Sequence, residues 1–242
     1  MKAVILSLFS TLFLALGPTF AAEPTAMGVL EEKRFELRPP KTAKVSVGYL
    51  FFLPQGYEKS QQRWPVLMYL HGAGESGTNL VKLKRNGPPK YVKAHPDFPF
   101  ILVCPQHHFS NDWDNATLLA LLDFVINNYR GDPDRLYLTG LSMGGGATWM
   151  LAAAHPEKFA AIVPVSGFNL GDAAKLAKLP IWVFHGAKDS IISVECSRKM
   201  VSAIEAAGGK VKYTEFPGAH HNIWARTYDN PELYKWLLAQ KR

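Results

Sequence analysis

Residues 136–146 read Leu-Tyr-Leu-Thr-Gly-Leu-Ser-Met-Gly-Gly-Gly, and this stretch decides the fold. An apolar run typical of a buried strand leads into Gly-x-Ser-x-Gly, and a helical pattern follows over residues 143–154. The turn between such a strand and helix is so tight that side chains beside the serine must be very small, which glycine satisfies. The pentapeptide alone is also compatible with a chance glycine-rich turn. Its position between a strand and a helix favours Ser142 as a nucleophile held at the carboxyl end of the strand.

On both sides of this stretch, short apolar runs alternate with longer amphipathic segments, which is the pattern of an α/β domain. Nearly continuous apolar runs indicate parallel strands that are covered on both faces, while the first two strands look like an antiparallel hairpin. We therefore predict a mostly parallel eight-stranded sheet with helices on both faces. The expected strands are 34–37, 44–53, 65–70, 100–104, 135–139, 160–165, 181–184 and 211–216, and the expected helices are 116–129, 143–154, 194–207 and 231–240.

The composition fits one compact globular domain. The chain has 242 residues, of which 48% are hydrophobic and 19% charged, with 19 Gly, 17 Pro and only two Cys. These values exclude a fibre, a disordered tail and a disulfide scaffold. The formal net charge is +7, but no block of five like charges occurs, so we expect the excess charge to be scattered over the surface. Scattered charge argues against a nucleic-acid partner.

The first 21 residues have the organisation of a secretory signal peptide, with a basic start, an apolar run and a small-residue site. Cleavage after Ala21 places Thr19 and Ala21 at the small-residue positions, whereas cleavage one residue later would place the bulky Phe20 there. The apolar run of about 14 residues is short for a bilayer span of about 20, which leaves a retained membrane anchor as the alternative. We expect residues 22–242 to form a single catalytic domain that is secreted or periplasmic.

A serine hydroxyl needs a base within hydrogen-bond reach and a group that orients the base. When the nucleophile sits on such a turn, the acid and then the histidine follow on loops after later strands. Asp189 is the first carboxylate after the expected strand 181–184, although a helix cap or a turn residue is the alternative role. His220 and His221 both follow the expected strand 211–216. The residues alone leave either histidine as the base.

Residues 71–75 read His-Gly-Ala-Gly-Glu directly after another expected strand. Small residues let the backbone approach a substrate, so this loop is suited to hold one half of an oxyanion hole. We expect the backbone N–H groups of Ala73 and Met143 to be its two donors, the latter because Met143 follows the nucleophile. His71 and His185 each head a glycine-containing loop, and for both we expect a structural role.

These motifs resemble those of the α/β-hydrolase superfamily. The resemblance rests on Asp-Pro-Asp-Arg-Leu-Tyr-Leu-Thr-Gly-Leu-Ser-Met-Gly-Gly at 132–145, His-Gly-Ala-Gly-Glu at 71–75, Gly-Pro-Pro-Lys at 87–90 and Cys-Pro-Gln at 104–106. Within the superfamily the chain is similar to small secreted esterases grouped as phospholipase/carboxylesterase or prolyl-oligopeptidase-like "predicted peptidases". Those proteins are relatives of feruloyl and polyhydroxybutyrate-depolymerase-type esterases. The match extends over nearly the whole mature chain, about 45–240.

The resemblance also chooses between the two histidines. In that family the histidine loop commonly reads Gly-x-Gly-His-Asn-x-Trp, which falls on 218–224 and implies His221 as the base. His220 then stands where glycine is usual, beside the pocket, and Gly146 stands where a tyrosine is common. The implied chemistry is acyl transfer to water through an acyl-enzyme on Ser142, which needs no metal or organic cofactor.

A short connection carries the information about substrate. Lids in this superfamily are usually inserted after the sixth strand, but here only about 14 residues, 166–179, precede the next strand. We therefore expect no lid domain and an open cleft, which suits bulky or polysaccharide-linked acetyl or feruloyl esters. Trp113, Phe168, His220 and Trp224 are the candidate substrate-binding residues, with ordinary packing as the alternative for each aromatic ring.

Neither the cysteines nor the histidines predict a cross-link or a metal site. Cys104 ends one expected strand and Cys196 begins a helix, and in the strand order of this fold about 4.8 Å per strand step leaves them too far apart for a disulfide. We expect both to be free and buried. The histidine pairs at 107–108 and 220–221 are adjacent residues, which seldom reach one ion together, so no catalytic metal is expected.

Two other functions remain as alternatives to a carboxylic-ester hydrolase. A serine peptidase or amidase would use the same three residues, but it must protonate a poorer leaving group and usually carries gating domains. A non-catalytic binding protein on a hydrolase scaffold has no physical need of Ser142, Asp189 and His221 together. The expected partner is a small-molecule or polymer-linked ester, with neither nucleic acid nor stable membrane insertion.

Overall fold

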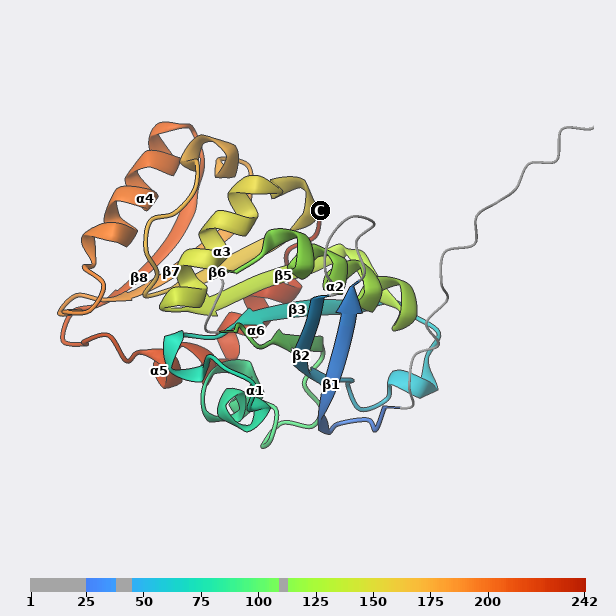
Figure 1. The fold of residues 1–242 in the computed structure, drawn as a ribbon. Coiled ribbons are helices and arrows are strands. Elements are labelled where there is room, and N and C mark those ends of the chain that lie inside the picture. The colour runs from blue at the N-terminus through green and yellow to red at the C-terminus, as the bar shows by residue number, and fades with distance from the viewer. Residues whose placement is uncertain (1–24, 38–44, 109–112) are drawn as a thin grey trace, which may run out of the picture.

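One eight-stranded sheet lies between two layers of helices (Figure 1). This computed structural model describes residues 25–37, 45–108 and 113–242, so the expected signal peptide lies outside the described residues. The strands are β1 (Leu30–Leu37), β2 (Val45–Phe52), β3 (Trp64–Leu70), β4 (Ile101–Pro105), β5 (Gly131–Leu141), β6 (Ala161–Val165), β7 (Ile181–Gly186) and β8 (Val211–Phe216). They are arranged in the order β1-β2-β4-β3-β5-β6-β7-β8.

The helices are α1 (Gly87–Tyr91), α2 (Asn115–Asn128), α3 (Met143–Ala154), α4 (Glu195–Ala206), α5 (Trp224–Tyr228) and α6 (Pro231–Leu238). Short 3₁₀ turns are η1 (Tyr57–Lys59), η2 (Ala73–Glu75), η3 (Leu80–Arg85), η4 (Pro156–Lys158) and η5 (Ala173–Leu176). Helices α2, α3 and α4 cover one face of the sheet, and α1, α5 and α6 cover the other (Figure 1). Each face has its own buried apolar cluster, around Trp149 on the α3 side and around Tyr228 on the α5 side.

The predicted mostly parallel sheet with an antiparallel start is confirmed. β1 pairs antiparallel with β2 and β2 with β4, whereas β3 to β8 run parallel to one another. The first strand begins at Leu30 rather than at the expected Arg34, because its charged start, Glu31 to Lys33, continues the antiparallel pairing with β2 along the edge of the sheet. The short helices α1 and α5 are not predicted by the apolar pattern.

The carboxyl ends of β3, β5, β7 and β8 lie along one edge of the sheet, and the loops there carry the predicted site residues. Between β6 and β7 the only described element is η5. Cys104 and Cys196 are free as expected, but only Cys104 is buried; Cys196 is half-buried, so that part of the expectation is wrong. Within the described ranges, no helix has the length and apolar character needed to cross a bilayer.

Candidate active site

Ser142 sits on the sharp turn between β5 and α3. Its backbone has φ 55° and ψ −116°, a conformation that a residue with a Cβ rarely adopts and that costs about 1–3 kcal/mol. Glycines permit the turn, because a Cβ on Gly140 would lie 2.3 Å from the Gly144 carbonyl oxygen, and a Cβ on Gly144 would lie 2.0 Å from the Leu70 oxygen. The side chain of Ser142 is therefore presented at the carboxyl edge of the sheet, where it is half-buried.

His221 lies within hydrogen-bond distance of the serine. Its Nε2 is 2.9 Å from Ser142 Oγ, and its Nδ1 is 2.6 Å from Asp189 Oδ2. Because the carboxylate only accepts, Nδ1 carries the proton, which leaves Nε2 to accept the hydroxyl proton of Ser142. Of the two adjacent histidines, the structure brings His221 to the serine, and His220 is exposed.

Asp189 is buried and is surrounded by hydrogen-bond donors. Besides His221, the backbone N–H groups of Ile191 and Ile192 each donate to Oδ1 at 2.9 Å. Burial by itself raises the pKa of Asp189, but the hydrogen bonds from His221 and the two backbone groups outweigh it and hold that pKa below its ordinary value. The carboxylate is therefore charged at neutral pH and is suited to orient an imidazole and to stabilise its protonated form.

A second buried histidine, His185, also contacts Asp189, and sequence reasoning missed this contact. His185 Nε2 is 3.1 Å from Asp189 Oδ2 and 2.9 Å from the Ile192 carbonyl oxygen. Since both partners only accept, Nε2 carries the proton, and Nδ1 accepts from the Ser197 hydroxyl at 2.7 Å. His185 thus links the acid to its own loop and to α4. The available signal was the histidine at the end of an apolar strand, four residues before the acid.

The acid loop and the histidine loop are also joined through their backbones. The N–H of Lys188 donates to the Ala219 carbonyl at 2.9 Å, and the N–H of Ala187 donates to Phe216 at 3.0 Å. Gly186 allows this approach, because a Cβ there would lie 2.2 Å from the carbonyl oxygen of His220. These contacts fix the two loops relative to each other.

The loop after β3 is held by buried polar groups. His71 donates from Nδ1 to the Gly72 carbonyl at 2.6 Å, and its Nε2 accepts from the His107 N–H at 2.8 Å. Burial lowers the pKa of His71 to about 4, and its hydrogen bond to the Gly72 carbonyl only partly opposes this, so the ring is neutral near pH 7. Glu75 Oε2 accepts from the Gly72 N–H at 3.0 Å, and Asn86 donates to its other oxygen. This structural use of His71 agrees with the expectation.

The two predicted oxyanion donors follow β3 and β5, whose carboxyl ends lie at the same edge of the sheet. A Cβ on Gly72 would be 3.5 Å from the Cβ of Ser142, which brings the neighbouring Ala73 to the same edge. Ala73 begins the turn η2, and Met143 begins α3 directly behind the serine. Ala73 is exposed and Met143 is half-buried.

The structure separates the four substrate-binding candidates. Trp113 is only 8% exposed and packs against the rings of His71 and His107, with centroids 5.0 and 5.2 Å apart. Phe168 is 46% exposed. Trp224 is half-buried and meets the His221 ring edge-on, with centroids 5.1 Å apart.

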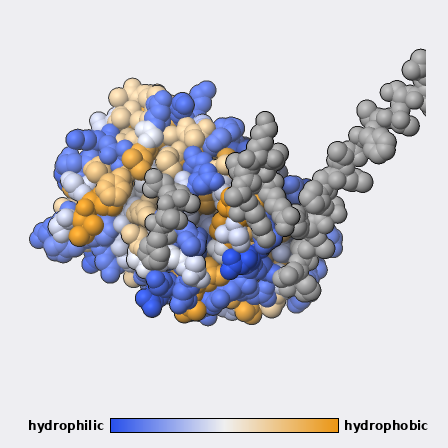
Figure 2. All heavy atoms as spheres, viewed as in Figure 1, coloured by the Kyte–Doolittle hydropathy of each residue, from blue (hydrophilic) through white to orange (hydrophobic). Residues whose placement is uncertain are grey.

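Phe168 follows β6 in a loop that packs against the start of α3, where a Cβ on Gly146 would lie 3.5 Å from the Cβ of Phe168. Other exposed apolar side chains in the loops after β6 and β7 are Leu170 and Ile191. Figure 2 shows orange and tan surface among hydrophilic residues on the side of the molecule where α4 and β8 lie. Among the residues that the structure describes, no group of three or more His, Cys, Asp or Glu side chains is placed to hold a metal ion.

Comparison with known proteins gives a family and several relatives. The model of the dienelactone hydrolase family matches residues 41–234. The chain is 24% identical over 205 residues to "Probable feruloyl esterase C" of Aspergillus terreus, an alignment that covers 75% of this chain and 74% of that protein. It is 26% identical over 141 residues to acetylxylan esterase A of Emericella nidulans, which covers 52% of this chain and 44% of that protein.

Solved structures with the same fold include an esterase and a peptidase. The crystal structure of a thermostable esterase is 30% identical to this chain, with a TM-score of 0.71; the match covers 87% of this chain and 63% of the esterase chain. An acylaminoacyl peptidase in complex with a chloromethyl ketone is 16% identical to this chain, with a TM-score of 0.63; the match covers 86% of this chain and 41% of the peptidase chain. At this identity the similarity is one of fold alone. The chain thus spans less than two thirds of acetylxylan esterase A and of both these structures.

The family match and the esterase relatives support enzymatic ester hydrolysis. The sheet order and the structural neighbours are those of the α/β-hydrolases, as the sequence motifs predict. Because the family model covers well over half of its residues, the chain belongs to the dienelactone hydrolase family within the α/β-hydrolase superfamily.

Proposed function

We propose that this protein is a serine esterase that hydrolyses carboxylic esters through an acyl-enzyme. The observation that carries the proposal is the hydrogen-bonded row of Asp189, His221 and Ser142, with 2.6 Å and 2.9 Å between successive side chains. A nucleophile, a base and an orienting acid in this order are what acyl transfer requires.

In the proposed first step, Ser142 Oγ attacks the ester carbonyl carbon while its proton passes to His221 Nε2. The negative charge that develops on the carbonyl oxygen is held by the backbone N–H groups of Ala73 and Met143. When the tetrahedral intermediate collapses, the bond to the leaving oxygen breaks, and His221 returns the proton to the alcohol. Water then attacks the acyl-enzyme by the same route, with His221 as base and then as acid, and releases the carboxylic acid and free Ser142.

For the substrate class, we propose acetyl or feruloyl esters linked to a polysaccharide. Relatives named as feruloyl and acetylxylan esterases support this class, as does the 15-residue connection from Ser166 to Pro180, whose one described element is η5. Phe168 offers an exposed ring at the site edge, and Trp224 offers a half-buried ring against the base. Aromatic faces of this kind bind phenyl and sugar rings. We assign secretion or a periplasmic location to the protein on the sequence of residues 1–21.

Turnover of p-nitrophenyl acetate and butyrate by wild type and Ser142→Ala tests the reaction. We expect the variant to lose hydrolysis and keep its fold by circular dichroism. Hydrolysis that survives in folded Ser142→Ala would refute the proposed nucleophile, and no turnover in wild type would favour a binding protein.

A substrate panel then separates ester classes from peptides. Acetyl-xylan and methyl ferulate should be hydrolysed, and a peptide anilide should not. Preference for the anilide would instead support the peptidase alternative. His221→Ala should abolish turnover, while His220→Ala should mainly change the preference among these esters; the opposite pair of phenotypes would overturn the choice of base.

A further inference from the structure

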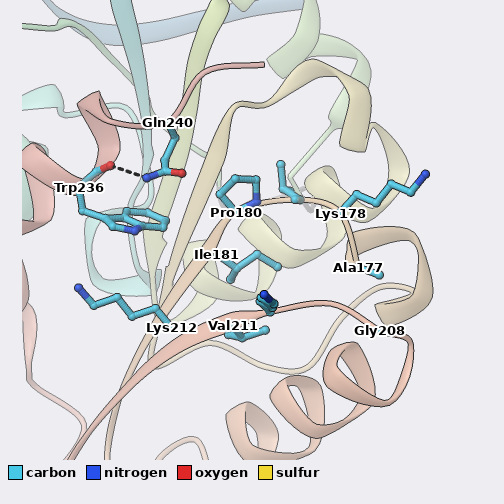
Figure 3. Close-up of a pocket in the computed structure, with 11 residues that line it drawn as sticks. Ala177, Lys178, Pro180, Ile181, Gly208, Val211, Lys212, Trp236 and Gln240 are labelled. Carbon is cyan, nitrogen blue, oxygen red and sulfur yellow. Dashed lines mark hydrogen bonds between the residues drawn. The ribbon is translucent and has the colours of Figure 1, made fainter.

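A cleft opens at the edge of the sheet opposite to the site, where β7 and β8 begin. It has a volume of about 570 Å³, and its floor is formed by Pro180, Ile181, Val211 and the half-buried Trp236 (Figure 3). A second hollow of about 690 Å³ shares the wall 177–180 and continues toward η4. Since β7 has six residues at about 3.3 Å each, its two ends are about 17 Å apart, and the cleft is remote from the catalytic side chains.

Basic side chains outnumber acidic ones among the residues that line the two hollows. Their basic lining residues are Lys175, Lys178, Lys210, Lys212, Lys241 and Arg242, and their acidic lining residue is Glu157. The lining thus holds six of the 27 basic residues of the chain and one of its 20 acidic residues; Asp134, which does not line the hollows, pairs with Arg242. The sequence predicts that the excess charge is scattered over the surface; at this edge the fold brings basic residues from separate segments together. We call this surface the lysine cleft.

Most of these amines are available to a ligand. Lys175, Lys178 and Lys210 are exposed, and the ion pairs found among the described residues do not include them. Lys212 and Arg242 are partly engaged: Lys212 Nζ lies 3.3 Å from the Trp182 ring centroid, and Arg242 lies 3.5 Å from Asp134. Lys178 and Lys212 lie on opposite sides of Ile181, so positive groups flank the floor (Figure 3).

Trp236 supplies a fixed aromatic surface in the floor. Its ring meets that of Trp182 at 75° with centroids 5.5 Å apart, and Gln240 donates from Nε2 to its carbonyl at 3.0 Å. In Figure 3 the carboxamide oxygen of Gln240 points away from Trp236, which leaves it available as an acceptor for hydroxyl groups. An indole and a proline beside hydrogen-bonding groups match the apolar face and hydroxyl rim of a sugar ring.

We propose that the lysine cleft is a non-catalytic binding site for a carboxylate-bearing polysaccharide, one that contains uronic acid units. Separate lysine amines act as point charges, which suits carboxylates spaced along a polymer better than paired Arg forks would. The two adjoining hollows give an elongated surface that fits several successive sugar units. The use of the lysine cleft to retain substrate rests on the proposed function. A polymer held at this edge of the sheet would raise the concentration of its ester groups near the candidate active site at the opposite edge.

Binding is tested in the Ser142→Ala background, so that esterase turnover is not required for the result. The variant Lys175→Gln/Lys178→Gln/Lys210→Gln removes three exposed charges from the lysine cleft. A matched control, Lys59→Gln/Lys93→Gln/Lys199→Gln, removes three exposed lysines that do not line it. Affinity for polygalacturonate, glucuronoxylan and neutral arabinoxylan is measured by calorimetry at fixed ionic strength, with duplex DNA as a competitor.

We expect the parent to bind both acidic polymers and not arabinoxylan, and the cleft variant to bind them about tenfold more weakly, with the control within about twofold. Equal losses in both triple variants would show only a general charge effect and would overturn the proposal. Displacement of polygalacturonate by DNA at equal concentration would assign the surface to polyanions at large. With the serine restored, the cleft variant should hydrolyse p-nitrophenyl acetate as wild type does, so a failed binding test leaves the esterase proposal standing.

Discussion

Gly144→Ala is the most informative substitution in the turn beside the nucleophile. The added Cβ would lie 2.0 Å from the carbonyl oxygen of Leu70, whereas carbon and oxygen in contact are about 3.3 Å apart, so α3 and the end of β3 must separate by about 1.3 Å. Leu70 lies three residues before Ala73, and Gly144 follows Met143. The movement therefore pulls apart the two predicted oxyanion donors.

A displacement of about 1 Å costs about 10²-fold in rate, so we expect kcat for p-nitrophenyl acetate to fall at least that far. Crowding of a packed region also destabilises by about 1–3 kcal/mol, which corresponds to a loss of roughly 2–12 °C in Tm for a domain of this size. Steady-state kinetics measure the loss in kcat, and thermal unfolding followed by circular dichroism measures the loss in Tm, both on one preparation.

Gly146→Ala, two residues along the same helix, is the matched control. Its Cβ would lie 3.2 Å from Leu170 Cδ1, the end of a side chain that is 44% exposed and free to turn. We expect kcat within about twofold of wild type and a gain in stability of up to about 1 kcal/mol from replacing a helical glycine. A wild-type kcat in folded Gly144→Ala, or an equal loss of kcat in both variants, would refute the inference that the close approach of α3 and β3 makes Gly144 necessary for activity.

Three further predictions concern the residues around the base. Asp189→Asn should lower kcat about 10⁴-fold, because an amide nitrogen facing His221 favours the wrong tautomer; a loss below about tenfold in steady-state assays would contradict this. His185→Leu leaves Asp189 and the Ser197 hydroxyl without their hydrogen-bond partner. It should lower the free energy of unfolding in urea by about 1–3 kcal/mol and kcat by about 10–100-fold, with smaller effects for Ser197→Ala. An unchanged kcat would limit the role of His185 to stability. The pKa of His71 is about 4 in the folded protein against 6.5 unfolded, so the folded state binds fewer protons in this window, and stability should fall by up to about 3 kcal/mol as pH drops from about 6.5 to 4. His71→Gln should flatten that part of the pH dependence in urea titrations, and an unchanged slope would contradict the buried neutral ring.

Sequence patterns predict the fold well where burial is complete. Apart from the polar start of β5 at residues 131–135, the central strands β3 to β7 are mostly apolar, because helices cover both faces, and their ranges agree with the expected ones to within a few residues. The edge strand β1 is missed over its charged start, and α1 and α5 have only five residues each, too few for a helical period to emerge. In α1, the prolines after Gly87 were an available start signal.

The candidate site is predicted from local chemistry, whereas its supporting contacts depend on tertiary structure. Ser142, Asp189 and His221 each follow a strand on a loop of distinctive residues, so their types and order are legible in the chain. Choosing His221 over its neighbour needs the family resemblance, since both lie on one loop. The contact from His185 to Asp189 and Ser197 depends on how β7 and α4 pack, which no local pattern encodes.

The lysine cleft has no local pattern for the same reason. Its basic residues are spread between Lys175 and Arg242, with no run of more than two like charges along the sequence. Only the parallel order of β7 and β8, together with the return of α6 past the start of β8, brings them to one edge. Composition gives the excess of positive charge, and the fold decides where it acts.

Covalent labelling of Ser142 is the most direct test that this hydroxyl is the activated nucleophile. A fluorophosphonate reacts with an activated serine, and intact-mass spectrometry with peptide mapping locates the adduct. We expect a single adduct on the peptide containing Ser142, absent from Ser142→Ala, formed at least about 10²-fold more slowly in His221→Ala, and formed readily in His220→Ala. An adduct on another residue, or equal labelling rates in His221→Ala and wild type, would contradict the proposed row of Asp189, His221 and Ser142.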